Sequence, residues 1–309
     1  MRVRLRDGTR LFVEVEGMGL VIDGKQMQER PCLVLLHGGQ VDHSWFRPGF
    51  SRLAEAAQLI YMDRRGGGRS DLSTPERWNL TQWAEDVFET CDVLGIDHPV
   101  VLGSSLGGTV AMAYASRYPD HPAGLILAST TARPEGQAGI EVFRDLGGDE
   151  AAEAAASFYA RPSPETEEAF VRFCAPLATK FRWDPDELAR MRYSLDSTQH
   201  WVEHEAKTYD LLGDLSRVRC PVLLISGLDD PQAPPSGMRA IAEALPPGLA
   251  DLRTFPGAGH GVCRDDPEGF FAAVEDFLGR IGTAGSRQHP TPSNQFFAAY
   301  SPHSFWNQS

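Results

Sequence analysis

Short apolar runs alternate with longer helical patterns along most of this chain of 309 residues. The runs are mostly filled with apolar residues rather than strictly alternating, so both faces of each strand should be buried, as in a parallel sheet. Strands that alternate with helices in this way predict a doubly wound α/β fold. The apolar runs lie at 11–15, 32–36, 59–62, 100–102, 125–127, 222–225 and 249–255, and the clearest helical patterns lie at 80–94, 106–117 and 267–281.

The alternation stops between residues 133 and 215, where the sequence is typical of helices throughout. Residues 150–160 are rich in alanine, and Pro164 and Pro185 each open a further helical pattern with acidic residues close behind. A proline fits the first turn of a helix because its missing N–H would have no partner there, and a carboxylate meets the positive helix end. We predict an inserted helical cap at 133–215.

The insertion divides the chain into three parts. We expect residues 1–132 and 216–281 to form the sheet with its flanking helices. Residues 282–309 have one charged side chain, Arg287, and we expect them to form a flexible tail. The alternative is that this tail docks onto the same or another subunit through its aromatic residues, which are Phe296, Phe297, Tyr300, Phe305 and Trp306.

The charge of the chain argues against some classes of partner. Lys and Arg number 29 against 42 for Asp and Glu, so the formal net charge is −13. A field of this sign repels phosphate groups, so we expect no nucleic-acid partner and no binding to anionic membranes. No apolar run approaches the roughly 18 residues of a membrane span, and the first residues lack the apolar segment of a signal peptide. We therefore expect a cytoplasmic protein, of an oligomeric state that the sequence leaves open.

A G-x-S-x-G pattern at Gly103–Gly107 marks a candidate nucleophile, Ser105. The pattern directly follows the apolar run at 100–102 and leads into the helical pattern at 106–117. A sharp strand-to-helix turn holds the central serine in a strained conformation, so small residues must flank it two positions away on each side. The start of the helix also supplies N–H groups beside the serine that can stabilise an oxyanion.

A nucleophilic serine needs a base, and the base needs an orienting carboxylate. The run at 222–225 leads into an acidic turn that contains Asp229 and Asp230, and the run at 249–255 leads into a glycine-rich loop that ends in His260. Both lie at strand ends, where parallel sheets place their sites. We predict His260 as the base, while Asp229 and Asp230 remain competing candidates for the acid.

Taken together, these motifs resemble those of serine hydrolases with the α/β-hydrolase fold and, within that superfamily, the prolyl iminopeptidase group. The resemblance spans about residues 31–261 in chain order. It implies a mostly parallel eight-stranded sheet with an inserted helical cap. The matching stretches are His37–Gly39, Asp63–Ser70, Gly103–Gly108, Gly227–Asp230 and Gly257–His260.

The resemblance also implies roles for individual residues. In such enzymes the acid usually lies three residues after the glycine at the strand end, which selects Asp230. One oxyanion N–H comes from the residue after the His-Gly pair, here Gly39, and the other from the residue after the nucleophile, here Leu106. His37 and residues 63–70 would brace the loop near the serine. No metal and no organic cofactor is implied.

Two departures separate this chain from the iminopeptidases. Those enzymes usually continue His-Gly-Gly with Pro-Gly, where this chain has Gln40-Val41-Asp42, and they often carry Trp at the position of Leu106. Glutamates in their cap receive the free amino group of the substrate. Glu203 and Glu205 are candidates for that role here, together with Trp201 as a substrate-binding residue. Charges on a solvated helix are the simpler interpretation.

Three functions remain open at this point, each with a small molecule or short peptide as partner. The first is a serine hydrolase that cleaves a small amide, ester or lactone through an acyl-enzyme. The second is a proline iminopeptidase that releases N-terminal proline. The third is a cofactor-free perhydrolase or haloperoxidase, or a non-catalytic binding protein, on the same fold.

Overall fold

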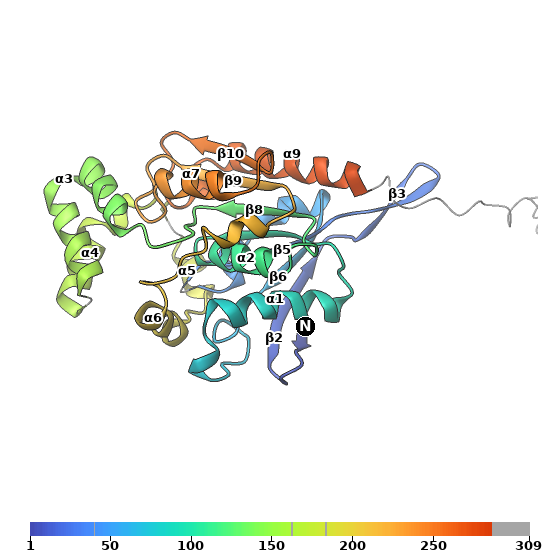
Figure 1. Cartoon of the computed structure of the whole chain (residues 1–309), viewed down its shortest axis with the longest axis horizontal. Coiled ribbons are helices and arrows are strands. Elements are labelled where there is room, and N and C mark those ends of the chain that lie inside the picture. Colours follow the sequence, from blue (N-terminus) through green and yellow to red (C-terminus); the bar gives the residue numbers. More distant parts are fainter. Residues whose placement is uncertain (40, 162, 183, 286–309) are drawn as a thin grey trace, which may run out of the picture.

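Eight strands form the central sheet in a computed structural model that describes residues 1–39, 41–161, 163–182 and 184–285 (Figure 1). Their order is β1-β2-β6-β5-β7-β8-β9-β10, and neighbours pair in parallel from β6 to β10, while β1 and β2 are antiparallel. The predicted mostly parallel α/β fold is confirmed. The strands are β1 (Arg2–Arg4), β2 (Arg10–Glu16), β5 (Cys32–Leu36), β6 (Gln58–Met62), β7 (Val100–Ser104), β8 (Gly124–Ala128), β9 (Val222–Gly227) and β10 (Ala250–Phe255).

Both faces of the sheet are covered by helices, and each face contributes to a separate core cluster, because successive side chains of a strand point to opposite sides. In β5, Val34 and Leu36 belong to one core cluster, and Leu33 and Leu35 belong to the other. The first cluster packs against α1 (Leu80–Leu94), α2 (Leu106–Arg117) and α7 (Pro235–Ala244). The second packs against the 3-10 helices η1 (His43–Phe46) and η2 (Gly49–Glu55) and against α8 (Val262–Asp265) and α9 (Pro267–Gly285).

Four helices lie between β8 and β9 in the sequence, and we call them the inserted helices. They are α3 (Gly136–Ala160), α4 (Pro164–Phe173), α5 (Pro185–Arg190) and α6 (Leu195–His204). As predicted, α4 begins at Pro164, after a capping box in which Ser163 and Thr166 bond reciprocally. Figure 1 shows α3 and α4 at one end of the sheet, packed on each other around a small core of their own that includes Phe143.

Three features differ from the sequence prediction or add to it. The edge strand β1 and an exposed hairpin of β3 (Leu20–Asp23) and β4 (Gln26–Glu29) were not predicted. The last helix, α9, continues to Gly285, past the predicted start of the tail at residue 282. This extension has no proline to stop it, and a glycine in a helix costs only about 1 kcal/mol. The rest of the predicted tail, 286–309, lies outside the described residues.

The described part of the chain contains no helix that is both long enough and apolar enough to cross a membrane.

Candidate active site

The turn between β7 and α2 holds Ser105 in a conformation that L-amino acids rarely adopt, with φ 54° and ψ −124°. The flanking glycines make this turn sterically feasible. A Cβ atom on Gly103 would collide with the carbonyl oxygen of Gly107, and one on Gly107 would collide with the carbonyl oxygen of Leu36. The sequence pattern therefore reflects close backbone packing, and the serine side chain is presented at the C-terminal end of β7.

The loop after β10 brings His260 to the buried carboxylate of Asp230, which follows β9. The Nδ1 atom of His260 lies 3.0 Å from Oδ2 and 3.1 Å from Oδ1 of Asp230, whose side chain is fully buried. Backbone N–H groups of Gln232 and Ala233 each donate to Asp230 Oδ1 at 2.9 Å. Asp229 instead makes an ion pair with Lys180 at 3.5 Å, so the geometry pairs the histidine with Asp230.

The surroundings of His260 adjust its basicity. Burial of the imidazole opposes its protonation, but the charge of Asp230 and its hydrogen bond outweigh burial, so the pKa of His260 is raised above 6.5. Its backbone N–H donates to the carbonyl oxygen of Ala178 at 2.7 Å, which fixes the loop against the segment after the inserted helix α4. Ser104 and His260 line the same small cavity, so this loop reaches the turn that carries Ser105.

Two backbone segments meet beside Ser105. A Cβ atom on Gly38 would lie 3.5 Å from the Cβ of Ser105, so Gly38 lies next to the serine. Leu106 is the first residue of α2, where backbone N–H groups have no partner within the helix. The two residues predicted to stabilise an oxyanion are thus the next residues along these two segments, Gly39 after Gly38 and Leu106 after Ser105.

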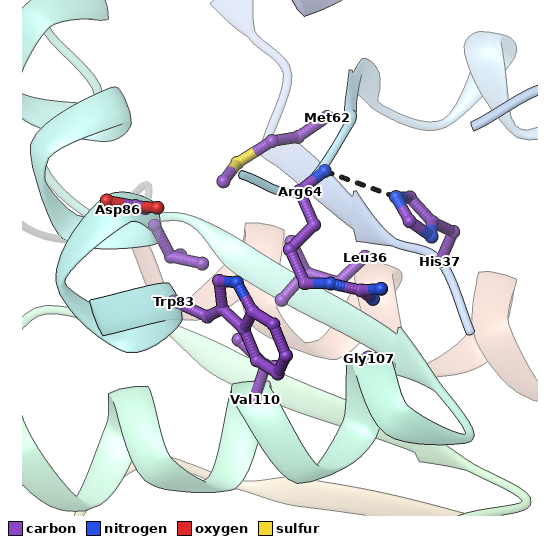
Figure 2. A pocket seen from close by; sticks show the side chains of 9 residues that line it. Leu36, His37, Met62, Arg64, Trp83, Asp86, Gly107 and Val110 are labelled. Atoms are coloured by element: carbon purple, nitrogen blue, oxygen red, sulfur yellow. Dashed lines mark hydrogen bonds between the residues drawn. The ribbon is translucent and has the colours of Figure 1, made fainter. Parts of the chain in front are cut away.

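A buried cluster supports the Gly38–Gly39 segment from below, and Figure 2 shows its members around Arg64. The Arg64 guanidinium donates to the carbonyl oxygen of Gly38 at 3.2 Å through Nη1 and to that of Gly39 at 2.7 Å through Nη2. The same guanidinium lies over the ring of Trp83, 4.6 Å from its centre. These contacts hold two consecutive carbonyl groups in fixed directions.

His37 completes this cluster as a neutral imidazole. Its Nε2 accepts from the backbone N–H of Arg64 at 3.2 Å, which leaves Nδ1 to donate to the carbonyl oxygen of Gly38 at 2.8 Å. Burial and the nearby charge of Arg64 lower the pKa of His37 to about 4, so the ring stays neutral near pH 7. A role for His37 as a second base is disfavoured by these bonds, in keeping with the predicted bracing role.

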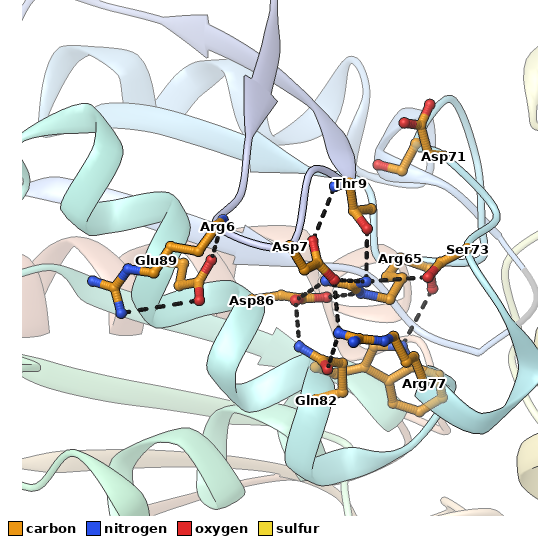
Figure 3. Close-up of polar contacts among 12 residues, drawn as sticks. Arg6, Asp7, Thr9, Arg65, Asp71, Ser73, Arg77, Gln82, Asp86 and Glu89 are labelled. Atoms are coloured by element: carbon orange, nitrogen blue, oxygen red, sulfur yellow. Dashed lines mark hydrogen bonds and ion pairs between the residues drawn. The ribbon is translucent and has the colours of Figure 1, made fainter.

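The next residue, Arg65, lies in a different polar network (Figure 3). Its Nε and Nη2 donate to both oxygens of Asp86 at 2.8 and 2.7 Å, and its Nη1 donates to Asp7 at 2.6 Å and to Thr9 at 2.8 Å. Burial opposes the charge of Arg65, but these carboxylates outweigh burial and raise its pKa. The network joins α1 and the segment after β6 to the turn between β1 and β2, which we call the N-terminal hairpin.

Three potential metal ligands, Asp42, His43 and Asp63, lie within 4.8 Å of one another and are buried. Their atoms already have protein partners. Arg69 pairs with Asp42, and His43 Nδ1 lies 2.7 Å from Asp63 while its Nε2 lies 3.1 Å from Glu14. A cation placed here would have to displace Arg69, so these residues act as an ion-pair network that anchors the segment around η1.

The three predicted substrate-binding residues lie in α6 or directly after it and have contacts of other kinds. Glu203 accepts from Gln199 at 2.8 Å on the exposed side of the helix. Glu205 accepts from the backbone N–H of Leu80 at 2.9 Å and so caps the N-terminus of α1. Trp201 packs against Tyr209 and the core, with ring centres 5.8 Å apart. None of these contacts brings a side chain to Ser105 or His260.

Sequence reasoning missed one residue of α6 that does reach the site. The hydroxyl of Thr198 donates to the carbonyl oxygen of Gly39 at 2.9 Å, across 159 positions in the sequence. No local pattern marks this threonine. Arg64, by contrast, stood within a recognised motif, but only its general bracing role was predicted.

Comparison with known proteins agrees with this geometry. A sequence profile of the alpha/beta hydrolase fold family matches residues 31–267. The chain belongs to this family. The predictions of an α/β-hydrolase fold and of an α/β-hydrolase enzyme are thereby confirmed.

Its relatives include several kinds of hydrolase. A Caulobacter sp. (strain K31) protein, provisionally named carbamate hydrolase RutD, is 26% identical over 275 residues, which cover 85% of this chain and 96% of the relative. Among solved structures, proline iminopeptidase of Mycobacterium smegmatis has a TM-score of 0.74 at 22% identity, covering 92% of this chain and 99% of its own. A thermophilic esterase of Thermogutta terrifontis has a TM-score of 0.60 at 26% identity, covering 91% and 99%. The likeness to the iminopeptidase is one of fold alone.

Proposed function

We propose that this chain is a serine hydrolase that cleaves a small ester, amide or lactone, with Ser105, His260 and Asp230 as its catalytic triad. The observation that carries the proposal is the strained Ser105 at the strand-to-helix turn, combined with the contact of 3.0 Å between His260 and the buried Asp230. We also propose that the inserted helices form the cap predicted at 133–215, over the C-terminal ends of the strands.

In the proposed reaction, the Oγ of Ser105 attacks the carbonyl carbon of the substrate while Nε2 of His260 takes the hydroxyl proton. Asp230 holds the imidazole in the required tautomer through Nδ1. The N–H groups of Gly39 and Leu106 stabilise the oxyanion, at about 3 kcal/mol for each donor in comparable sites. His260 then protonates the leaving group, and water, deprotonated by His260, hydrolyses the acyl-enzyme and frees Ser105.

The substrate class rests on weaker support than the reaction. Relatives that bear the names of a carbamate hydrolase and an esterase favour a small acyl substrate. The iminopeptidase alternative requires carboxylates that receive an amino group. The contacts of Glu203 with Gln199 and of Glu205 with Leu80 do not favour that use, so we propose the hydrolase of small substrates.

A fluorophosphonate probe tests the catalytic assignment directly. We expect covalent labelling at Ser105 in the wild type and in Ser104→Ala, and none in Ser105→Ala, with all three unfolding at similar temperatures. Ser105→Ala should lower turnover by about 10⁴-fold or more. Labelling that persists in Ser105→Ala would overturn the assignment, and no labelling of the wild type would favour a binding protein.

A substrate panel then tests the substrate class. It compares p-nitrophenyl acetate, a γ-lactone, a simple carbamate and prolyl p-nitroanilide, with the N-acetylated form of the last as its control. We expect the ester, lactone or carbamate to be hydrolysed faster than the prolyl arylamide. Preferential hydrolysis of free prolyl arylamide over its N-acetylated form would instead establish the iminopeptidase.

A further inference from the structure

The carbonyl of Gly38 and the N–H of Gly39 are two ends of the same peptide unit. A peptide unit is planar and normally trans, so its C=O and N–H point in opposite directions. Arg64 Nη1 and His37 Nδ1 both donate to this carbonyl oxygen, at 3.2 and 2.8 Å. Donors that fix the carbonyl on one side of the unit therefore also fix the direction of the Gly39 N–H on the other side.

The guanidinium of Arg64 makes a second contact that only its shape allows. Its Nη2 donates to the carbonyl oxygen of Gly39 at 2.7 Å, so one rigid fork spans two consecutive carbonyl groups. Thr198 donates to the same Gly39 oxygen from α6. The Gly39 residue is thus held through the peptide units on both of its sides.

Arg64 carries its charge without a direct ion pair, and the charge of the adjacent Asp63 only partly offsets the effect of burial. It is 6% exposed and makes no ion pair with any residue in the part of the chain that the structure describes. Burial lowers its pKa to about 10, which leaves it protonated near pH 7. A buried cation without a counter-ion is costly to the fold, because a desolvated charge loses its hydration. A side chain kept only for stability would be apolar here, beside Trp83 and Val110.

We propose that Arg64 is a positioning residue of the oxyanion hole, which aims the Gly39 N–H at the reacting carbonyl oxygen and polarises that peptide unit. The inference rests on the proposed function, in which Ser105 is the nucleophile and Gly39 an oxyanion donor. A carbonyl that accepts from a cation makes the N–H at the other end of its peptide unit a stronger donor, since hydrogen bonds in a chain polarise one another. The effect is largest in the transition state, where negative charge develops on the substrate oxygen.

The test compares Arg64→Met, Arg64→Lys and the neighbouring control Arg65→Lys. For each variant, kcat and KM are measured with p-nitrophenyl acetate, together with the inhibition constant of phenyl trifluoromethyl ketone, which forms a tetrahedral adduct with a reactive serine. We expect Arg64→Met to lower kcat by about 10- to 100-fold with little change in KM. The inhibition constant should rise by the same factor. Arg64→Lys, which keeps the charge but loses the fork, should fall between Arg64→Met and the wild type.

The control separates positioning from stability. Arg65→Lys should unfold at lower temperature, while its folded fraction keeps the kcat and the inhibition constant of the wild type. A wild-type kcat in Arg64→Met would overturn the inference. So would a lowered kcat with an unchanged inhibition constant in either Arg64 variant, since partial unfolding alone gives that result. If Arg64→Met does not fold, the inhibition constant of Arg64→Lys decides by the same criterion.

Failure of the proposed function has a different signature. In that case the wild type itself is not labelled by the fluorophosphonate probe at Ser105 and does not bind the trifluoromethyl ketone. If the wild type is labelled and both Arg64 variants match it in kcat and in the inhibition constant, the function stands and the role of Arg64 is rejected.

Discussion

Arg64 and Arg65 are consecutive, both buried, and both follow β6, yet they hold different parts of the molecule. Arg65 is neutralised by Asp86 and Asp7 and ties α1 to the N-terminal hairpin. Arg64 donates to the backbone of Gly38 and Gly39. Both guanidinium groups reach α1, since Arg64 lies over Trp83 and Arg65 donates to Asp86, but their other partners differ.

The comparison shows two ways in which a fold accommodates a buried charge: Arg65 forms ion pairs, whereas Arg64 bonds to backbone carbonyl groups. Arg65 and Asp86 are both buried, so removal of either one leaves the other as an unpaired buried charge and lowers the free energy of unfolding. Arg64 has no direct ion pair. Its replacement by an apolar residue removes a buried charge, and the carbonyl groups of Gly38 and Gly39 each lose one hydrogen bond. We expect the Arg65 side to govern stability and the Arg64 side to govern catalysis.

The largest predicted effect is on the Arg65 side. Asp86→Ala should lower the free energy of unfolding by about 3 kcal/mol, because Arg65 remains buried with Asp7 alone. The control Asp92→Ala removes an exposed partner of Arg6 from the same helix and should cost less than about 1 kcal/mol. Urea denaturation measures both. A loss of kcat per folded molecule in Asp86→Ala would contradict the expectation that the contacts of Arg65 affect stability and not catalysis.

The next effect concerns pH and distinguishes His260 from His37. His260 must be neutral to accept a proton, and its pKa is raised above 6.5, so kcat/KM for p-nitrophenyl acetate should fall about tenfold per pH unit below that pKa. His37, with a pKa of about 4, should not titrate in this range. A midpoint below 6.5, or a slope of two protons, would show that a different group or both rings control activity.

A smaller effect is expected at acid pH on the Arg65 side. Burial opposes ionisation of Asp7, but bonds from Arg65 and Thr9 outweigh it and lower the pKa from 3.8 to about 2. Its contribution is therefore present above pH 3.8 and lost as the pH falls toward 2. Asp7→Asn should cost about 1 kcal/mol at pH 6, given the partial exposure of Asp7, and should flatten this acid transition. Equal stability losses in the variant at pH 6 and pH 2 would contradict this.

The smallest effect is on the Arg64 side. Thr198→Val removes the hydroxyl that donates to Gly39 and should lower kcat about threefold, the equivalent of a weak neutral hydrogen bond. Thr198→Ser keeps the hydroxyl and serves as the matched control. Steady-state kinetics on the ester that the wild type hydrolyses compare the two, and equal kcat values would show that this contact does not support the oxyanion loop.

Much of the fold follows from local sequence patterns. Predicted helices at 80–94 and 106–117 match α1 and α2, whose starts carry Asn79 as a cap and the Ser105 turn. The missed hairpin of β3 and β4 exposes nearly all of its residues, and Met27 is the one apolar residue of β4. The apolar run at 20–22 in β3 is mostly exposed, so hydrophobicity alone does not distinguish it from a loop.

The candidate site also contains residues that sequence patterns predict and residues that they do not. Their place at strand ends was enough to propose Ser105, His260 and an acid at position 229 or 230, since strand ends converge at one edge of a parallel sheet. The choice between Asp229 and Asp230 needed a family resemblance, because both residues lie in the same predicted turn after the run at 222–225. Thr198 could not be found, because its contact with Gly39 depends on how α6 packs against a distant loop.

The exposed hairpin has a practical consequence for attaching this protein to a solid support. It pairs only with itself, and it lies far from the inserted helices in Figure 1. The chain has three lysines, of which Lys25 lies at the tip of this hairpin and Lys180 pairs with Asp229 next to the candidate acid. With arginine at Lys180 and Lys207, amine coupling through side chains would occur at Lys25 alone and leave the candidate active site facing solution.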